Sequence, residues 1–178
     1  MADFFTVITD EQAFLIRSAP LFFVGSADPS LSATPHGPGP VNVSPKGAVP
    51  LHILDRNRVA CVDYTGSGNE TARHSLAGGP VTVMVCAFER DNAAVVRLYG
   101  KATVTPLEES PFADVLLESP ATEIRLPQRQ AIVIQVERTA TSCGYGVLVM
   151  TFEAQRTIAD RGRRYKAMKK AGMTALNP

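Results

Sequence analysis

The 178-residue sequence predicts a mainly β (α+β) protein, in which about six antiparallel strands form a small barrel with short flanking helices. Most apolar segments are short and rich in β-branched or aromatic residues, which is typical of strands. Segments 81–88 and 94–104 are joined by the polar sequence ERDN and form the clearest hairpin. A sheet of this many strands exposes two edges unless it closes, so a barrel is favoured.

Turn and loop signals separate the expected strands. Residues 28–40 contain four prolines and two glycines and are expected to form a loop. Residues 54–57 are expected to form a turn. Segment 21–26 is apolar almost throughout and is expected to be buried on both faces. The expected strands are residues 21–26, 41–45, 58–64, 81–88, 94–104 and 130–138, with a further short strand at 147–151.

Helix signals are local and few. Thr9 and Gln12 have the spacing of a capping box, and the apolar side of the helix that follows is expected to consist of Phe14, Leu15 and Ala19. Asn69 is placed to cap a second short helix that runs to about Leu76, where the sequence GGP ends it. The remaining helices are expected at residues 108–117 and 158–170.

Length and composition predict a single domain of residues 1–178, with 152–178 as a C-terminal helical extension. The net charge of +1 provides no overall basic field for nucleic acid, so a small-molecule partner is expected. The basic residues of segment 158–170 favour a solvated helix face, and contact with phosphate groups or nucleic acid is the alternative. With no signal peptide and no membrane-length apolar run, we expect a soluble, cytoplasmic protein without a membrane partner.

The sequence predicts no catalytic residue and no metal site. No two of its three cysteines have CxxC spacing, so buried or idle thiols are expected. Its three histidines are scattered, without the i, i+4 spacing of a helical metal site. The GxSxG motif of hydrolases is absent, and Glu70 and Glu89 are expected to be solvated charges rather than an acid–base pair.

A first polar cluster lies in the sequence VNVSPKG, residues 41–47. Strand alternation places Asn42 and Ser44 on one face, and Lys46 follows Pro45 where the strand is expected to end. A hydroxyl, a carboxamide and an ammonium group near one strand end predict a site for an anion. The alternative is an ordinary polar turn with a solvated lysine.

A second polar cluster lies in the sequence YTGSGNET, residues 64–71. It places the hydroxyls of Thr65, Ser67 and Thr71 and the amide of Asn69 at a strand-to-helix junction with two glycines. Free backbone N–H groups at a helix start form a neutral receptor for phosphate, and Lys46 supplies the countercharge if the two strands are neighbours. The alternative is a plain Gly-rich turn with an Asn cap.

One further pair of residues has two open interpretations. Arg97 and Tyr99 share one face of a strand, opposite Val96 and Leu98. That face is either exposed to solvent or lies beside a dimer cleft, where Arg97 would orient a ring or an anion.

The order of several motifs along the chain resembles the pyridoxamine 5'-phosphate oxidase-like, FMN-binding split-barrel family. The motifs are FFVGSA, VNVSPKG, VDYTGSGNET, GPVTVMVCAFE, RLYGKATV and TSCGYGV, and the resemblance covers residues 14–147. It implies a split β-barrel with flanking helices that forms a homodimer with FMN at the subunit interface.

The resemblance also implies roles for individual residues. Asn42, Ser44, Pro45 and Lys46 would contact the flavin and its phosphate side. Tyr64 and Thr65 would lie against the ring system and the ribityl chain. The residues implied at the phosphate are Ser67, Gly68, Asn69 and Thr71, and Arg97 is a candidate to stabilise the reduced, anionic flavin.

The implied function is an FMN-dependent oxidoreductase, in which the flavin takes a hydride from NADH, NADPH or an organic substrate. A reductase that uses the deazaflavin F420 is a close variant, and a non-catalytic protein that binds flavin or haem on the same barrel is the alternative. The true pyridoxamine phosphate oxidases carry an Arg-Lys pair where this chain has Glu70 and Thr71, and a tryptophan that it lacks altogether. Synthesis of pyridoxal phosphate is therefore not expected.

Overall fold

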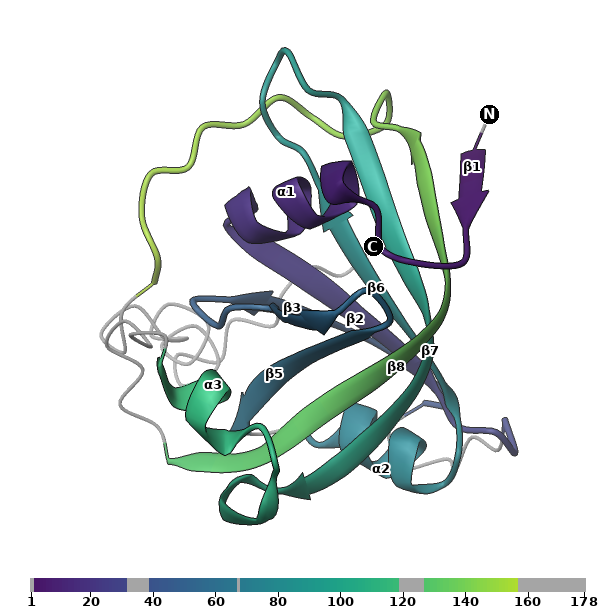
Figure 1. The fold of residues 1–178 in the computed structure, drawn as a ribbon, viewed down its shortest axis with the longest axis vertical. Coiled ribbons are helices and arrows are strands. Elements are labelled where there is room, and N and C mark those ends of the chain that lie inside the picture. The colour runs from purple at the N-terminus through teal and green to yellow at the C-terminus, as the bar shows by residue number, and fades with distance from the viewer. Residues whose placement is uncertain (1, 32–38, 67, 119–126, 157–178) are drawn as a thin grey trace, which may run out of the picture.

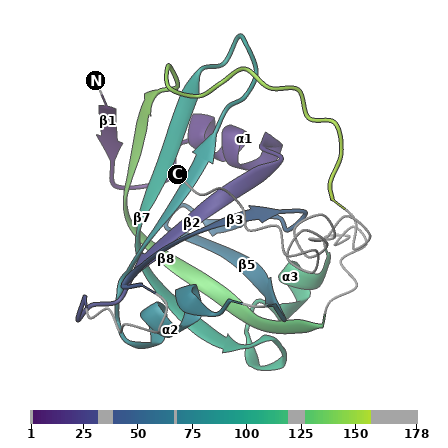
Figure 2. The ribbon, with the colours of Figure 1, turned by 180° about the vertical axis from the view of Figure 1, so that it is seen from behind.

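The computed structural model of the chain describes residues 2–31, 39–66, 68–118 and 127–156. The expected helix at 158–170, His36 and Ser67 lie outside these residues. The described chain folds as one strongly curved antiparallel sheet with short helices beside it (Figures 1 and 2). The predicted mainly β split barrel is confirmed, although the sheet has eight strands rather than about six.

The strands are β1 (Ala2–Phe5), β2 (Leu21–Ala27), β3 (Val41–Gly47), β4 (His52–Asp55), β5 (Arg58–Tyr64), β6 (Pro80–Cys86), β7 (Ala94–Pro106) and β8 (Gln128–Cys143). The helices in the described residues are α1 (Asp10–Ser18), α2 (Glu70–Leu76) and α3 (Ala113–Glu118), together with the 3-10 turn η1 (Leu107–Glu109). No helix in the described part of the chain is long and apolar enough to span a membrane.

The strand order explains the shape of the barrel. Hydrogen-bonded neighbours follow the path β3-β2-β6-β7-β8-β5-β4, and β1 adds to β8. β7 and β8 are 13 and 16 residues long and curve across the whole molecule (Figure 1). On its edge away from β7, β8 pairs first with β5 and then with β1. The two end strands, β3 and β4, are joined by residues 48–51 alone. The sheet therefore curls round on itself and leaves a split between β3 and the β5 side.

Side chains on the concave face of the sheet form the core. β6, β7 and β8 direct alternate valine, leucine and isoleucine side chains inward, and Leu15 and Ile16 of α1 pack onto the same cluster. The prediction that Phe14 lies on this apolar side was wrong, because its side chain is exposed. The predicted capping box of α1 is confirmed, because the backbone N–H of Gln12 donates to Thr9 Oγ1 at 3.2 Å and that of Thr9 donates to Gln12 Oε1 at 3.1 Å. The cap begins α1 at the position where its apolar side covers the barrel.

Several element predictions were wrong. β1 and β4 were missed, because four-residue strands carry too little alternation to be recognised. Residues 147–151 form no strand, and Met150 donates one backbone hydrogen bond to Phe88 from an exposed segment. The single helix expected at 108–117 is divided into η1 and α3, because Pro111 keeps Ser110 extended.

The prediction for β2 was also wrong in one respect. It alternates between buried and half-buried residues rather than being buried on both faces. Its buried residues face the core, whereas Leu21, Phe23 and Gly25 lie on the convex face of the sheet.

Gly100 marks the most crowded point between the two long strands. The pairing of β7 with β8 shifts its register between Tyr99 and Gly100, and a Cβ atom at Gly100 would lie 1.9 Å from the carbonyl oxygen of Gln135. We expect Gly100→Ala to lower the free energy of unfolding by about 2 to 4 kcal/mol, because backbone would have to move. Gly146→Ala is the matched control, since nothing lies within 4 Å of its Cβ position. Thermal melts that coincide for the two variants would contradict this packing.

Candidate functional site

β3 turns its polar side chains toward the interior of the molecule. Asn42, Ser44 and Lys46 are half-buried, whereas Val41 and Val43 are 62% and 65% exposed. The register with β2 sets this orientation, because Lys46 lies opposite the buried Phe22 and therefore on the concave face. The predicted alternation is confirmed, and the polar face is the one that points inward.

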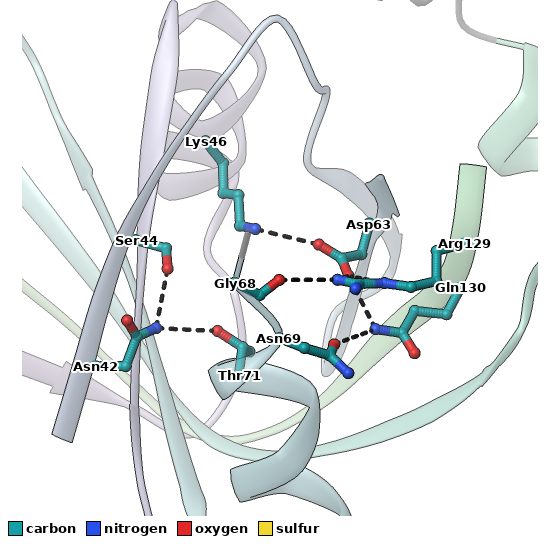
Figure 3. A network of polar contacts seen from close by, with 9 residues as sticks. All are labelled: Asn42, Ser44, Lys46, Asp63, Gly68, Asn69, Thr71, Arg129 and Gln130. Atoms are coloured by element: carbon teal, nitrogen blue, oxygen red, sulfur yellow. Dashed lines mark hydrogen bonds and ion pairs between the residues drawn. The ribbon is translucent and has the colours of Figure 1, made fainter. Parts of the chain in front are cut away.

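The second polar cluster approaches β3 from the other side of the split. Tyr64 ends β5, the loop follows, and Asn69 precedes α2. Asn42 Nδ2 donates to Ser44 Oγ at 2.9 Å and to Thr71 Oγ1 of α2 at 3.4 Å (Figure 3). β3 and β5 are not hydrogen-bonded neighbours in the sheet, so pairing of the two strands does not bring Lys46 to the second cluster. Their side chains nevertheless meet across the split.

The two clusters line one cavity of about 440 Å³. This volume lies within the range of ordinary small-molecule sites. Predicted site residues in its wall are Ser44, Pro45, Lys46, Tyr64, Thr65, Gly68, Asn69 and Thr71. Asn42 joins them through its hydrogen bond to Thr71. The plain-turn interpretations of the two clusters leave this convergence unexplained.

Asp63 is the hub of the polar network in this cavity. Its residue is 9% exposed, and its carboxylate accepts hydrogen bonds from three side chains (Figure 3). Lys46 Nζ of β3 lies 3.4 Å from Oδ1, and Gln130 Nε2 lies 2.8 Å from Oδ2. Arg129 donates to Oδ2 through Nη2 and through Nε at 3.1 Å. One carboxylate therefore links β3, β5 and β8.

Arg129 and Gln130 also hold the loop before α2. Arg129 Nη2 donates to the carbonyl oxygen of Gly68 at 3.1 Å, and Gln130 Nε2 donates to Asn69 Oδ1 at 2.9 Å. Asn69 occupies the N-cap position that was predicted, but its side chain makes no capping hydrogen bond. Its amide belongs to the polar network instead.

Sequence reasoning missed Asp63, Arg129 and Gln130. Asp63 pairs with Gln130 and Tyr64 pairs with Gln128, so Arg129 is an extra residue in β8 at this point. In a regular strand Arg129 and Gln130 would point to opposite faces, whereas the bulge allows both to reach Asp63. Asp63 and Arg129 are 66 residues apart in the sequence, so no local sequence pattern could predict this bulge.

Two acidic side chains, Asp63 and Glu70, line the cavity and oppose the binding of an anion near them. Glu70, the first residue of α2, also lines it, and its Oε2 would lie 2.6 Å from a Cβ atom at Gly68. Among the described residues, Glu70 has no hydrogen-bond or ion-pair partner. α2 has seven residues, and its first turn carries this carboxylate. An anion would therefore bind beside the ammonium group of Lys46 rather than at the N-terminus of α2.

Arg97 does not line this cavity. It lies on β7 opposite Met84 and Ala140, on the convex face of the sheet, and its Nη1 donates to Ser142 Oγ at 2.9 Å. Tyr99 shares this face and lies under the guanidinium of Arg138. Within one chain, the structure leaves Arg97 apart from the other predicted site residues.

Among the described residues, the cysteines and histidines belong to no group of side chains that could hold a metal ion. Burial raises the pKa of the Cys61 thiol to about 12, and Cys86 is also buried with a raised pKa. Cys143 is exposed, and none of the three cysteines forms a disulfide. The prediction of buried or idle thiols is confirmed for Cys61 and Cys86. His74 Nδ1 lies 3.0 Å from Ser26 Oγ in a buried contact between α2 and β2.

Comparison with known proteins identifies a relative of clear sequence similarity. No family model matches the sequence. The chain is 31% identical over 149 residues to the pyridoxamine 5'-phosphate oxidase family protein ustO of Aspergillus flavus, which covers 83% of this chain and 56% of that protein. The chain therefore spans little more than half of the length of this relative.

Solved structures share the fold at lower identity. A Clostridium acetobutylicum protein related to general stress protein 26, of the pyridoxinephosphate oxidase family, has a TM-score of 0.53 and 13% identity over 75% of this chain and 86% of its own. An FMN-binding protein from Syntrophomonas wolfei has a TM-score of 0.51 and 13% identity over 78% of this chain and 84% of its own. Both share the fold of this chain.

The polar network around Asp63 is expected to stabilise the folded protein. Asp63→Ala leaves Lys46 and Arg129 without their shared carboxylate in a mostly buried place, so we expect the free energy of unfolding to fall by about 3 kcal/mol. The control is Asp10→Asn, because the Asp10–Arg56 ion pair is exposed, with side-chain exposures of 92% and 64%. It should cost less than about 1 kcal/mol. Urea unfolding measures both, and equal small losses would show that Asp63 does not hold the split together.

Proposed function

Because the chain belongs to the pyridoxamine 5'-phosphate oxidase-like family, we propose that it binds FMN in the cavity between β3, β5 and α2 and acts as a flavin-dependent oxidoreductase. The observation that supports this most is the convergence of two polar clusters, separate in the sequence, around Lys46 in one cavity. The FMN-binding protein from Syntrophomonas wolfei, which has the same fold, also supports the proposal that this chain binds FMN.

The donors in the cavity fit the polar arm of a flavin nucleotide. Lys46 Nζ provides a positive charge, and the hydroxyls of Ser44, Thr65 and Thr71 provide neutral hydrogen-bonding groups. The carboxylate of Glu70 opposes a doubly charged group beside α2. We therefore expect the phosphate to bind on the Lys46 side of the cavity.

The side chains of this chain would bind and orient the cofactor. FMN, when bound, supplies hydride and electron transfer, so the protein needs no nucleophile of its own. Tyr64, half-buried in the cavity wall, offers an aromatic surface to a flat ring. The Aspergillus relative extends well beyond the matched region.

The purified protein tests this proposal directly. A flavin absorption spectrum, with FMN identified by mass after release, is the expected result, and anaerobic bleaching by NADH or NADPH would demonstrate turnover of the reductive step. A haem or F420 spectrum would overturn the assignment of FMN. Bound FMN that no reductant bleaches would support the non-catalytic flavin-binding alternative.

We further propose that the chain forms a homodimer through the convex face of β2 and β3. Val41 and Val43 lie exposed on the outer face of an end strand, next to the half-buried Phe23 of β2 and Met84 of β6. Exposed apolar side chains on an edge strand usually mark a contact surface. Arg97 lies on the same convex face, so a second copy is the route by which it would approach a flavin.

Lys46→Ala tests the role of the charge. Loss of one charged partner of the phosphate should weaken FMN binding about 10- to 150-fold, while riboflavin binding should barely change. Lys101→Ala, an exposed lysine of β7, is the control and should bind both ligands like the parent protein. An equal loss for riboflavin and FMN would show that Lys46 does not contact the phosphate.

Val43→Lys tests the dimer. A charge on the exposed apolar face should convert the dimer to a monomer at micromolar concentration, because burying it in the interface is costly. The control is Thr103→Lys, on an exposed position of β7, which should remain dimeric. Analytical ultracentrifugation distinguishes the species. A parent protein that sediments as a monomer and still holds one FMN per chain would refute the shared interface.

A further inference from the structure

The cavity wall and the side chain of Arg129 behind it carry more charges than a phosphate site needs. Lys46 and Arg129 share the carboxylate of Asp63, and their side chains are only 21% and 25% exposed. Glu70 adds a second carboxylate to the cavity wall. The four charges sum to zero in the protein alone. A receptor for an anion must keep at least one of these cations from being neutralised by the carboxylates.

The contacts of Asp63 are unequal. Arg129 binds Oδ2 through two nitrogens, and Gln130 reinforces the same oxygen at 2.8 Å. Lys46 approaches the other oxygen, Oδ1, at 3.4 Å, which is long for a charge-assisted hydrogen bond. Asp63 is therefore held mainly by Arg129 and Gln130, and Lys46 keeps N–H groups that can turn toward a ligand.

From this asymmetry we infer that Arg129 is the resident counter-ion of Asp63 and thereby reserves Lys46 for the anionic group of the ligand. This inference rests on the proposed function, because it takes the phosphate of FMN as that group. Arg129 is a positioning residue, since it acts on the ligand through Asp63 and Lys46 and is not part of the cavity wall. It sets the preference of the site for phosphorylated flavin over riboflavin.

Removal of Arg129 would change the net charge of the site. Without Arg129, Lys46 would become the principal partner of Asp63, and the remaining charges of Lys46, Asp63 and Glu70 would sum to −1. A phosphate would then meet a site of its own sign. Riboflavin carries no charge, so its binding should respond little to the same change.

Four proteins compared by titration with FMN and with riboflavin test this inference. Arg129→Gln should weaken FMN binding about tenfold or more, with less than a threefold effect on riboflavin. Arg129→Lys keeps the charge but not the fork that reaches both Asp63 and the Gly68 carbonyl, and it should keep most of the preference for FMN. The double variant Asp63→Asn/Arg129→Gln removes one charge of each sign, so the preference for FMN over riboflavin should return to within about threefold of the parent.

A purely structural role gives a different pattern. If Arg129 serves only to fix the loop through Gly68, Arg129→Gln should weaken FMN and riboflavin equally, and the double variant should remain weak; either result overturns the inference. Should Arg129→Gln fail to fold, Arg129→Lys and the double variant decide alone, since a lost FMN preference in either one contradicts the charge argument. A parent protein that binds neither flavin would overturn the proposed function, and this inference with it, whereas a parent that binds FMN with an unchanged preference in Arg129→Gln would overturn the inference only.

Discussion

The ion cluster at Asp63 is the contact on which the arrangement of this barrel depends. β3 ends one side of the sheet and is joined to β2 alone by backbone hydrogen bonds, so side chains must hold its inner face to the β5 side. Asp63 does so by receiving Lys46 from β3 and Arg129 from β8. The desolvation of a mostly buried carboxylate is offset by several donors at once, which a single lysine at 3.4 Å would not achieve.

β3 has an unusual polarity, because its polar side chains face inward and its valines face outward. An end strand of a small barrel would ordinarily turn Val41 and Val43 toward the core and its polar residues toward water. Here the register with β2 reverses this and directs Asn42, Ser44 and Lys46 inward. A slip of one residue would fill the cavity with valines and remove Lys46 from Asp63. The register of one strand thus determines both the polar cavity and the apolar outer face.

The sequence was sufficient where the signal was local. The capping box at Thr9, the start of α2 after Asn69 and the two polar motifs are short patterns, and the structure brings most of their residues into one cavity. It was insufficient where two distant strands had to be aligned. In the sequence, Arg129 directly precedes the strand expected at 130–138, and no motif includes it. Only the bulge opposite Asp63 turns its side chain toward the site. Residues 147–151 have strand composition, but no strand in the described part of the chain pairs with them.

The residues that close the split also line the cavity, and this couples ligand binding to folding. Lys46 and Asp63 belong to both, so a ligand that binds Lys46 acts on the contact that holds β3 in place. A ligand that binds only the folded form adds to stability by mass action, by about 2.7 kcal/mol at a hundred times its dissociation constant. It would also relieve Asp63 of one of its two cations, which is tolerable only because Arg129 and Gln130 remain. The bulge in β8 that supplies both residues is therefore what allows one cluster of charges to serve the fold when the cavity is empty and a ligand when it is filled.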